Sequence, residues 1–341
     1  MKRKLAFLLI LLTAFTGFTA SAQISDLLKK AKSKGSKMEQ WQLLKTFRDP
    51  YILKAPFFLD DKQGWLAAYG GIFKTVDGGL TWEQQFSAGN EFNIVYFLNP
   101  KDGFAAGNGT FFYTHDGGSN WIWKDDIESS SSPFTKMFFI NDQVGYLVGD
   151  NFYKTTNAGK DWQKIKLPLP INVRDLRTRD AWYTDINHIF VVAENELLWT
   201  SEDGGASWKL DKREFFDGDK KDYTQIAFAD SKKGYIAVVG YNFHALLKTT
   251  DGGATWAKTD VIDNPIRKMS LNGNFGYAVC GNVVYITEDG FETVKPYFVP
   301  AGADPDMVIL SEVFMLSPEK GWATVGSSGD AFKIYVPKPK Q

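Results

Sequence analysis

The chain has 341 residues, with 39 Lys and Arg against 40 Asp and Glu and a formal net charge of -1. A balance this even produces no strong electric field, which argues against nucleic acid or an anionic membrane as a general partner. An aromatic content of 15% together with 31 glycines fits a chain of many short strands and turns.

The first 22 residues have the features of a secretory signal peptide. Lys2-Arg3-Lys4 is a positive region, Leu5 to Leu12 is apolar, and Ala20-Ser21-Ala22 is a small-residue cleavage site. No later stretch is long and apolar enough to span a bilayer. We therefore expect an exported protein without a transmembrane anchor in the mature chain, periplasmic or secreted after cleavage near Ala22. Residues 23–38 carry a basic run, which we interpret as a flexible linker.

One turn motif then returns six times: Thr or Ser, any residue, Asp or Asn, two mostly small residues, two further residues and Trp. The Asp or Asn positions are 39, 41, 46, 48 and 38 residues apart, a period that suits one four-stranded propeller blade. We call these segments the Asp turns. Their key residues are Asp77 and Trp82, Asp116 and Trp121, Asn157 and Trp162, Asp203 and Trp208, Asp251 and Trp256, and Asp289, whose copy ends in Val294 instead of Trp.

Each Asp turn has a physical reason to recur. The carboxylate can accept hydrogen bonds from the amides that follow it, and glycine adopts the positive φ that other residues resist. The Trp introduces the next strand, where its ring can cover the turn. We interpret the Asp turns as structural, without a ligand, because repeat signatures report how a unit folds.

The Asp turn is the end of a longer unit. A Gly-aromatic pair precedes it by 12 to 17 residues, as in Gly64-Trp65 and Gly145-Tyr146, and an apolar run such as Phe57-Phe58-Leu59 comes about seven residues earlier. The unit therefore predicts four strands. The fourth unit has Asn187-His188-Ile189-Phe190 where the pair is expected.

The two ends of the repeat region complement each other. A seventh unit starts at Val313 and stops after Tyr335 without an Asp turn, so its fourth strand is missing. The segment from Glu39 to Leu44 looks like the strand that follows each Asp turn. We predict that this N-terminal strand closes the ring and removes an open edge.

These turns resemble the Asp-box (bacterial neuraminidase repeat) propellers. The full unit, in which a Gly-aromatic pair is followed by a segment such as Lys248-Thr-Thr-Asp-Gly-Gly-Ala-Thr-Trp256, is similar to the photosystem II stability/assembly factor family. The resemblance covers about residues 40 to 336. It implies a non-enzymatic seven-bladed scaffold that holds an assembling membrane protein. Nothing in the sequence indicates a photosynthetic host, and the exported chain resembles secreted bacterial members best.

We therefore predict an all-β fold: a seven-bladed β-propeller of four-stranded blades with Asp-box turns, closed by an N-terminal strand. The propeller spans residues 39–338 as a single domain, and residues 339–341 form a tail. We expect a monomer.

For function, we expect an exported, non-enzymatic scaffold in the cell envelope that binds or assembles another envelope or secreted protein. The alternative is a glycan-binding protein or a glycoside hydrolase, because sialidases and several glycan hydrolases share Asp boxes. A sialidase would need an Arg-Ile-Pro motif and spaced arginines, which the sequence lacks. A hydrolase with two carboxylates stays open, because such a pair is defined by separation in space.

We place the partner-binding surface on the long loops between blades and on the turns between second and third strands, which share one rim. The leading residues are a basic cluster suited to an acidic partner and an aromatic loop suited to a protein or a sugar. They are Arg174, Arg177 and Arg179, and Tyr241, Phe243 and His244.

No cofactor or metal is expected. Every Gly-Gly pair belongs to the repeat, and the three histidines lie in three different units. The carboxylates of residues 217–222 are interrupted by two lysines and make a poor calcium loop. The single cysteine, Cys280, lies in an apolar strand and is expected in the core.

Overall fold

The computed structural model describes residues 41–46, 52–125, 127, 134–171, 173, 177–211, 216, 221–281, 283–298, 310–317, 320–325 and 330–335. All of them belong to the second of two units, Met1–Gln40 and Trp41–Gln341. The predicted signal peptide of residues 1–22, the linker of residues 23–38, the tail of residues 339–341 and Arg174 lie outside the described residues.

The described part of the chain is all-β. Its sheet β2 to β7 has six strands: β2 (Leu53–Phe58), β3 (Gly64–Thr75), β4 (Glu83–Phe97), β5 (Gly103–Gly107), β6 (Thr110–Thr114) and β7 (Ile122–Trp123). The next sheets are β8 (Lys136–Phe139), β9 (Gly145–Val148), β10 (Phe152–Thr155), β11 (Gln163–Ile165), and β12 (Thr178–Tyr183), β13 (Ile189–Ala193), β14 (Leu197–Ser201), β15 (Lys209–Asp211). They are followed by β16 (Asp222–Phe228), β17 (Gly234–Gly240), β18 (Phe243–Thr249), β19 (Ala257–Thr259), and by β20 (Lys268–Asn272), β21 (Phe275–Cys280), β22 (Val283–Thr287), β23 (Lys295–Phe298). The last sheet combines β24 (Leu310–Ser317), β25 (Lys320–Val325) and β26 (Asp330–Tyr335) with β1 (Trp41–Thr46).

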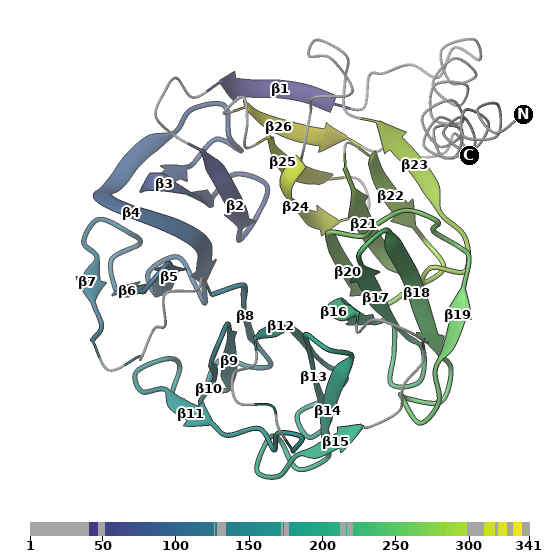
Figure 1. Cartoon of the computed structure of the whole chain (residues 1–341). Helices are drawn as coiled ribbons and strands as arrows, with labels where there is room; N and C mark the ends of the chain where they lie inside the picture. The colour runs from purple at the N-terminus through teal and green to yellow at the C-terminus, as the bar shows by residue number, and fades with distance from the viewer. Residues whose placement is uncertain are drawn as a thin grey trace, which may run out of the picture. The chain divides into compact units, whose positions relative to one another are not determined.

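The sheets have the arrangement of a propeller (Figure 1), so the predicted all-β fold of four-stranded blades is confirmed. Paired strands run antiparallel, and the first strand of each blade, such as β12 or β16, lies innermost. Apolar side chains of neighbouring blades form shared cores; Tyr146 of β9 and Trp199 of β14, for instance, belong to one cluster. No helix that could cross a membrane is found among the described residues.

The Asp turns form as the sequence predicts. In the first copy Asp77 accepts hydrogen bonds from the Thr75 hydroxyl at 2.8 Å, the Thr81 amide at 2.9 Å and the Thr81 hydroxyl at 2.6 Å. The Gly79 amide donates to the Thr75 hydroxyl at 2.9 Å, and the Trp82 indole donates to the Gly79 carbonyl at 2.9 Å. The side chains of the turn therefore satisfy its Gly79 and Thr81 amides, and the Gly78 amide donates to the Lys62 carbonyl at 2.8 Å.

Two copies keep the turn without the usual glycine. Ala158 has φ 58° at the first glycine position, and Phe291 has φ 60° at the second. Phe291 is buried and its ring packs on Tyr235 at 5.5 Å. Packing between blades thus holds a backbone conformation that a side chain disfavours locally.

The Gly-aromatic pair has two separate roles. A Cβ on Gly64 would lie 2.4 Å from the ring of Phe58, its partner across the strands, so only glycine leaves room for that ring. Trp65 then reaches the following Asp turn and donates to the Gly117 carbonyl at 3.2 Å. In the fourth unit the register places Ile189 and Phe190 at these two positions.

The aromatic member of the pair bonds one blade to the next Asp turn at several places. The bonds run from Trp65 to Gly117, Tyr146 to Gly204 at 3.0 Å, Tyr235 to Gly290 at 2.8 Å and Trp322 to Gly78 at 2.9 Å. We call them the interblade bonds. Because each joins one repeat unit to the Asp turn of the next, they hold successive units at a set distance.

The N-terminal strand β1 pairs with β26 in antiparallel register, with Trp41 opposite Ile334 and Thr46 opposite Asp330. The sheet order β1-β26-β25-β24 makes β1 its outermost strand. A segment near the start of the chain thus covers the edge of a sheet built from the C-terminal region.

We expect the Asp turns to lose stability in acid. Hydrogen bonds from the residue four positions later lower the pKa of Asp77, Asp116, Asp203 and Asp251 from 3.8 to about 2. A carboxyl whose pKa is lower in the folded protein than in the unfolded chain stabilises the fold when the pH lies above its unfolded-state pKa. This stabilisation is lost as the pH falls from the unfolded-state pKa to the folded-state pKa. The midpoint of thermal unfolding should therefore drop most between about pH 4 and about pH 2.

The Asn157 turn shows how to design a control for this pH experiment. Asn157 makes the same turn with an amide, accepting from the Asp161 amide at 2.9 Å. Asp251→Asn should stay folded at neutral pH and show a smaller acid-induced shift of the unfolding midpoint. An identical pH profile for Asp251→Asn and the native protein would contradict this account.

We also expect a variant lacking residues 39–47 to unfold at a temperature several degrees lower and to self-associate, because the edge of β26 loses its partner. Differential scanning calorimetry and light scattering measure both effects. A variant lacking residues 23–38 is the matched control and should behave as the native chain. Equal stability of the two variants would show that β1 contributes nothing to the fold.

Candidate functional site

The inner strands surround a cavity of about 730 Å³, which we call the axial cavity. Its lining comes from the first half of the inner strands, from the loops that enter them and from the ends of the second strands β17 and β21. The lining residues are Lys54, Asn93, Phe134, Thr135, Arg179, Thr224, Gln225, Val239, Pro265, Ile266, Arg267, Lys268, Val279, Leu310 and Glu312. Polar and charged groups from different units therefore meet at one place.

The charged lining of the axial cavity is mainly cationic. Lys54, Arg179, Arg267 and Lys268 face Glu312 as the single acidic lining residue. Three of the cations are held by carboxylates: Lys54 by Glu91, Lys268 by Glu312 at 3.1 Å, and Arg179 by Glu194 at 2.6 Å. Arg267 is exposed and has no ion pair among the described residues. The cavity can thus receive a negatively charged group.

Asp180 organises the wall next to the axial cavity. It is 1% exposed, accepts from the Ile226 amide of the next blade at 3.0 Å, and pairs with the Lys136 ammonium of the preceding blade at 2.7 Å. Lys136 also donates to the Ala181 carbonyl at 2.9 Å. One buried carboxylate therefore connects three blades.

The surroundings shift the pKa of two lysines in opposite directions. Burial lowers the pKa of Lys136, although Asp180 opposes that effect. Burial also disfavours the charged form of Lys268, but the carboxylates of Glu312 and Asp180 outweigh it and raise its pKa. Lys268 therefore stays cationic where it borders the cavity.

The predicted basic cluster divides between two surroundings. Arg179 lines the axial cavity, and its Nε is buried without a hydrogen-bond partner in the described part of the chain. Arg177 is exposed and lies 3.7 Å from a carboxylate oxygen of Asp150. The structure thus brings Arg179, but not Arg177, to the cavity.

The predicted aromatic loop lies at the turn between β17 and β18. Tyr241 is 93% exposed. Phe243 packs edge-on against Phe216 at 4.9 Å, and His244 pairs with Asp263 at 3.2 Å. Of these three side chains, only Tyr241 is largely free of packing.

Sequence reasoning did not select Lys54, Arg267 and Lys268. A signal for two of them was present. In each unit one inner-strand residue pairs with the glycine position of the Gly-aromatic pair. Lys54, Arg179 and Arg267 each lie four residues before that inner-strand residue. Aligning the repeats on that residue would have placed the three cations at equivalent positions.

The structure shows no metal cluster among the residues it describes: no group of three or more His, Cys, Asp or Glu side chains is placed to hold an ion. Cys280 is buried, and burial raises the pKa of its thiol to about 12. This thiol therefore stays protonated at neutral pH.

The fold and the turns define an Asp-box propeller, and comparison with known proteins gives the family that it resembles. The family model "Photosynthesis system II assembly factor YCF48" matches residues 154–261. The photosystem II assembly lipoprotein Ycf48 of Synechococcus sp. (strain CC9902) is 28% identical over 185 residues, which are 50% of this chain and 51% of the relative. The chain thus aligns with about half the length of this curated relative, and the predicted family resemblance is confirmed.

Solved structures share the fold. A structure titled "YCF48 bound to D1 peptide" has a TM-score of 0.64 at 18% identity and covers 88% of this chain and 98% of its own. YCF48 from Cyanidioschyzon merolae has a TM-score of 0.66 at 17% identity, covering 87% and 98%. The GH74 xyloglucanase from Xanthomonas campestris has a TM-score of 0.61 at 13% identity, covering 86% of this chain and 53% of the enzyme.

We expect Asp180→Ala to destabilise the protein strongly. The substitution leaves the Lys136 ammonium and the Ile226 amide without their acceptor, and breaking a buried pair costs about 3–5 kcal/mol. Chemical denaturation measures the free energy of unfolding. The control is Asp260→Ala, which removes an exposed pair with Lys258 at 3.6 Å and should change it by less than about 1 kcal/mol. Equal effects of the two substitutions would contradict the role given to Asp180.

Proposed function

We propose that this protein is a non-enzymatic, exported scaffold that binds an acidic segment of another protein at the axial cavity. The observation that carries the proposal is the cationic lining contributed by several units, with Arg267 outside any described ion pair and Arg179 Nε without a partner among the described residues. Guanidinium groups hold carboxylates through two parallel hydrogen bonds, which gives both affinity and direction.

The relatives support a protein partner. Ycf48 is named an assembly lipoprotein, and one solved structure of YCF48 is titled as bound to a D1 peptide. We infer that the present propeller, which is similar to them, also holds a peptide segment of a protein. Its export to the cell envelope is supported by the signal-like residues 1–22 and by the lipoprotein name of the relative.

We further propose that the propeller has seven blades and that β1 closes the ring. The six-stranded sheet supports this count, because β4 pairs with β3 through residues 83–91 and with β5 through residues 92–97. It thereby serves as the last strand of one blade and the first of the next. Closure is supported by the β1 and β26 pairing, the Trp322 bond to Gly78 and the ion pair of Lys320 with Asp61 at 2.9 Å.

The aromatic loop predicted from the sequence lies next to the axial cavity and extends the proposed binding surface. Val239 lines the cavity, and the exposed Tyr241 lies two residues further on, at the tip of the same hairpin. A bound segment that leaves the cavity toward this hairpin would contact the Tyr241 ring. We therefore keep Arg177, Arg179, Tyr241, Phe243 and His244, together with Arg174, as the proposed partner-binding residues.

A glycoside hydrolase is the second candidate, because GH74 enzymes share the fold. Hydrolysis of this kind needs two carboxylates facing one substrate. Glu312 is the single carboxylate among the residues that line the axial cavity, and it is paired with Lys268. This arrangement favours binding over bond cleavage at this site.

We expect Arg267→Glu to weaken binding of an acidic peptide by at least about ten-fold while the fold is retained, because the charge reversal repels the ligand carboxylate. Fluorescence anisotropy with a panel of labelled peptides that end in Asp or Glu, each with a free and an amidated C-terminus, measures the affinity. Lys258→Glu on the outer strand β19 is the matched charge reversal and should bind as the native protein does. Native affinity in Arg267→Glu, or no binding of any peptide in the panel, would refute the proposed site.

A further inference from the structure

The interblade bonds are missing at two junctions for a chemical reason. Phe104 and Phe190 occupy the position of Trp65, Tyr146, Tyr235 and Trp322, and a phenylalanine ring has no hydrogen-bond donor. The Asp turn beyond Phe104 carries Ala158 and Gly159, and the one beyond Phe190 carries Gly252 and Gly253. A cavity opens at each of these two junctions.

A second donor is missing at the same junctions. Lys74 and Lys154 donate to the same turn carbonyls as the aromatic side chains, at 3.0 Å to Gly117 and 2.6 Å to Gly204. Tyr113 and Thr200 stand at the equivalent position, directly before the hydroxyl residue of their Asp turns. Neither side chain places an ammonium group against the neighbouring turn.

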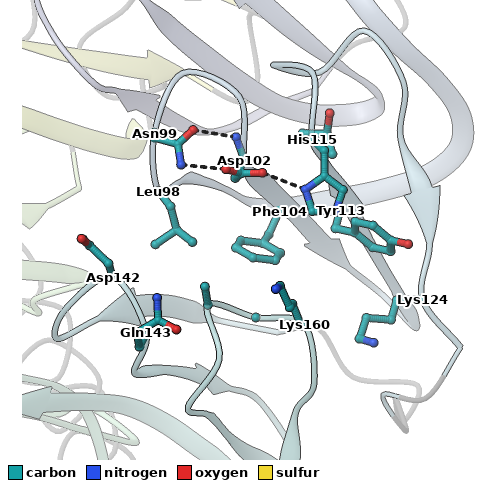
Figure 2. Close-up of a pocket in the computed structure, with 13 residues that line it drawn as sticks. Leu98, Asn99, Asp102, Phe104, Tyr113, His115, Lys124, Asp142, Gln143 and Lys160 are labelled. Carbon is teal, nitrogen blue, oxygen red and sulfur yellow. Dashed lines mark hydrogen bonds and ion pairs between the residues drawn. The ribbon is translucent and has the colours of Figure 1, made fainter.

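The cavity beside Phe104 has a volume of about 470 Å³, and we call it the interblade cavity (Figure 2). Its size falls in the range of small-molecule sites, about 300–1,000 Å³. Leu98 and Phe104 provide an apolar wall, and Tyr113 adds a second ring, which meets His115 edge-on at 5.2 Å. Aromatic rings next to polar groups are suited to a ligand that has an apolar face and a polar rim.

The polar rim of the interblade cavity is held in a fixed arrangement. The Asp102 carboxylate accepts from the Asn99 amide group at 2.8 Å and lies 2.7 Å from His115 Nδ1. Hydrogen bonding to His115 and to Asn99 also lowers the pKa of Asp102. Because the carboxylate can only accept, His115 carries its proton on Nδ1.

Charges of both signs surround the interblade cavity. Lys124 and Lys160 line it together with Asp102 and Asp142, so the four charges cancel. A ligand with one net charge would gain from half of these groups and lose against the other half. A neutral ligand with many donors and acceptors can use all of them.

We propose that the interblade cavity binds a neutral sugar unit. One face of the sugar ring packs on the half-buried Tyr113 and Leu98, which lie in front of the buried Phe104, and its hydroxyl groups bond the charged rim. Phe104 cannot donate a hydrogen bond to the Ala158 carbonyl. A hydroxyl group of the sugar donates to this carbonyl instead, as the Tyr146 hydroxyl does to the Gly204 carbonyl. The sugar thus takes the place of the missing interblade bond.

The junction beside Phe190 is a natural comparison. Its cavity is lined by Thr200 in place of Tyr113 and so lacks the second ring. It shares the missing bonds but not the aromatic wall. The sugar is therefore assigned to the Phe104 junction.

The test restores the missing donors. Phe104→Tyr combined with Tyr113→Lys copies the Tyr146 and Lys154 arrangement and fills the cavity. We expect isothermal titration calorimetry to detect binding of at least one neutral disaccharide, among cellobiose, maltose, xylobiose and diacetylchitobiose, to the native protein. The double variant should bind that disaccharide at least ten-fold more weakly. The same pair of changes at the other junction, Phe190→Tyr with Thr200→Lys, should leave the affinity unchanged.

A substitution at one exposed residue tests the same site in case the double variant does not fold. Lys160→Ala removes one rim group and should weaken the same disaccharide several-fold while circular dichroism stays native. The proposal is overturned if no neutral disaccharide binds the native protein, if only an acidic disaccharide such as digalacturonate binds, or if the affinity survives both sets of changes. Binding of an acidic peptide at the axial cavity should be unaffected in every one of these variants. The proposals for the two cavities are therefore tested independently.

Discussion

The interblade bond is the contact on which the rest of this propeller depends. An Asp turn can form from local sequence alone, because Thr75, Asp77 and Thr81 satisfy one another. The turn becomes part of a propeller when the neighbouring blade donates to its carbonyl, as Trp65 does to Gly117 and Trp322 does to Gly78. Each repeat contacts only its neighbours, so such a bond sets the spacing at each junction that has it.

The two cavities arise from different departures from this regularity. The axial cavity forms where inner strands begin, and its lining there differs from unit to unit, with cations such as Lys54 and Arg179 in some units and neutral polar residues such as Thr135 in others. The interblade cavity forms where Phe104 replaces a donor. In an array whose regular positions serve folding, positions that depart from the pattern are where a ligand can be recognised.

The similar proteins separate fold from function. Proteins titled as a peptide-bound YCF48 and as a GH74 xyloglucanase share this architecture at 18% and 13% identity. The same fold is thus found in a protein with a bound peptide and in a protein named as a hydrolase. Function therefore has to be argued from the residues that line each cavity. In this chain the axial lining has cations and a paired Glu312, which suits the recognition of a carboxylate.

The sequence by itself determined the repeat, the Asp turns and the four-stranded unit, because turn chemistry and strand alternation act between residues close in the chain. It also singled out Arg179, which lines the axial cavity. The tertiary structure decided that Lys54, Arg179 and Arg267 line one cavity, that Asp180 connects three blades, and that Phe104 leaves an opening beside Ala158. These features depend on contacts between residues in different repeats, often 40 or more positions apart in the chain. No local pattern records such contacts, because the distance between two blades is set by packing and not by the order of residues within either one.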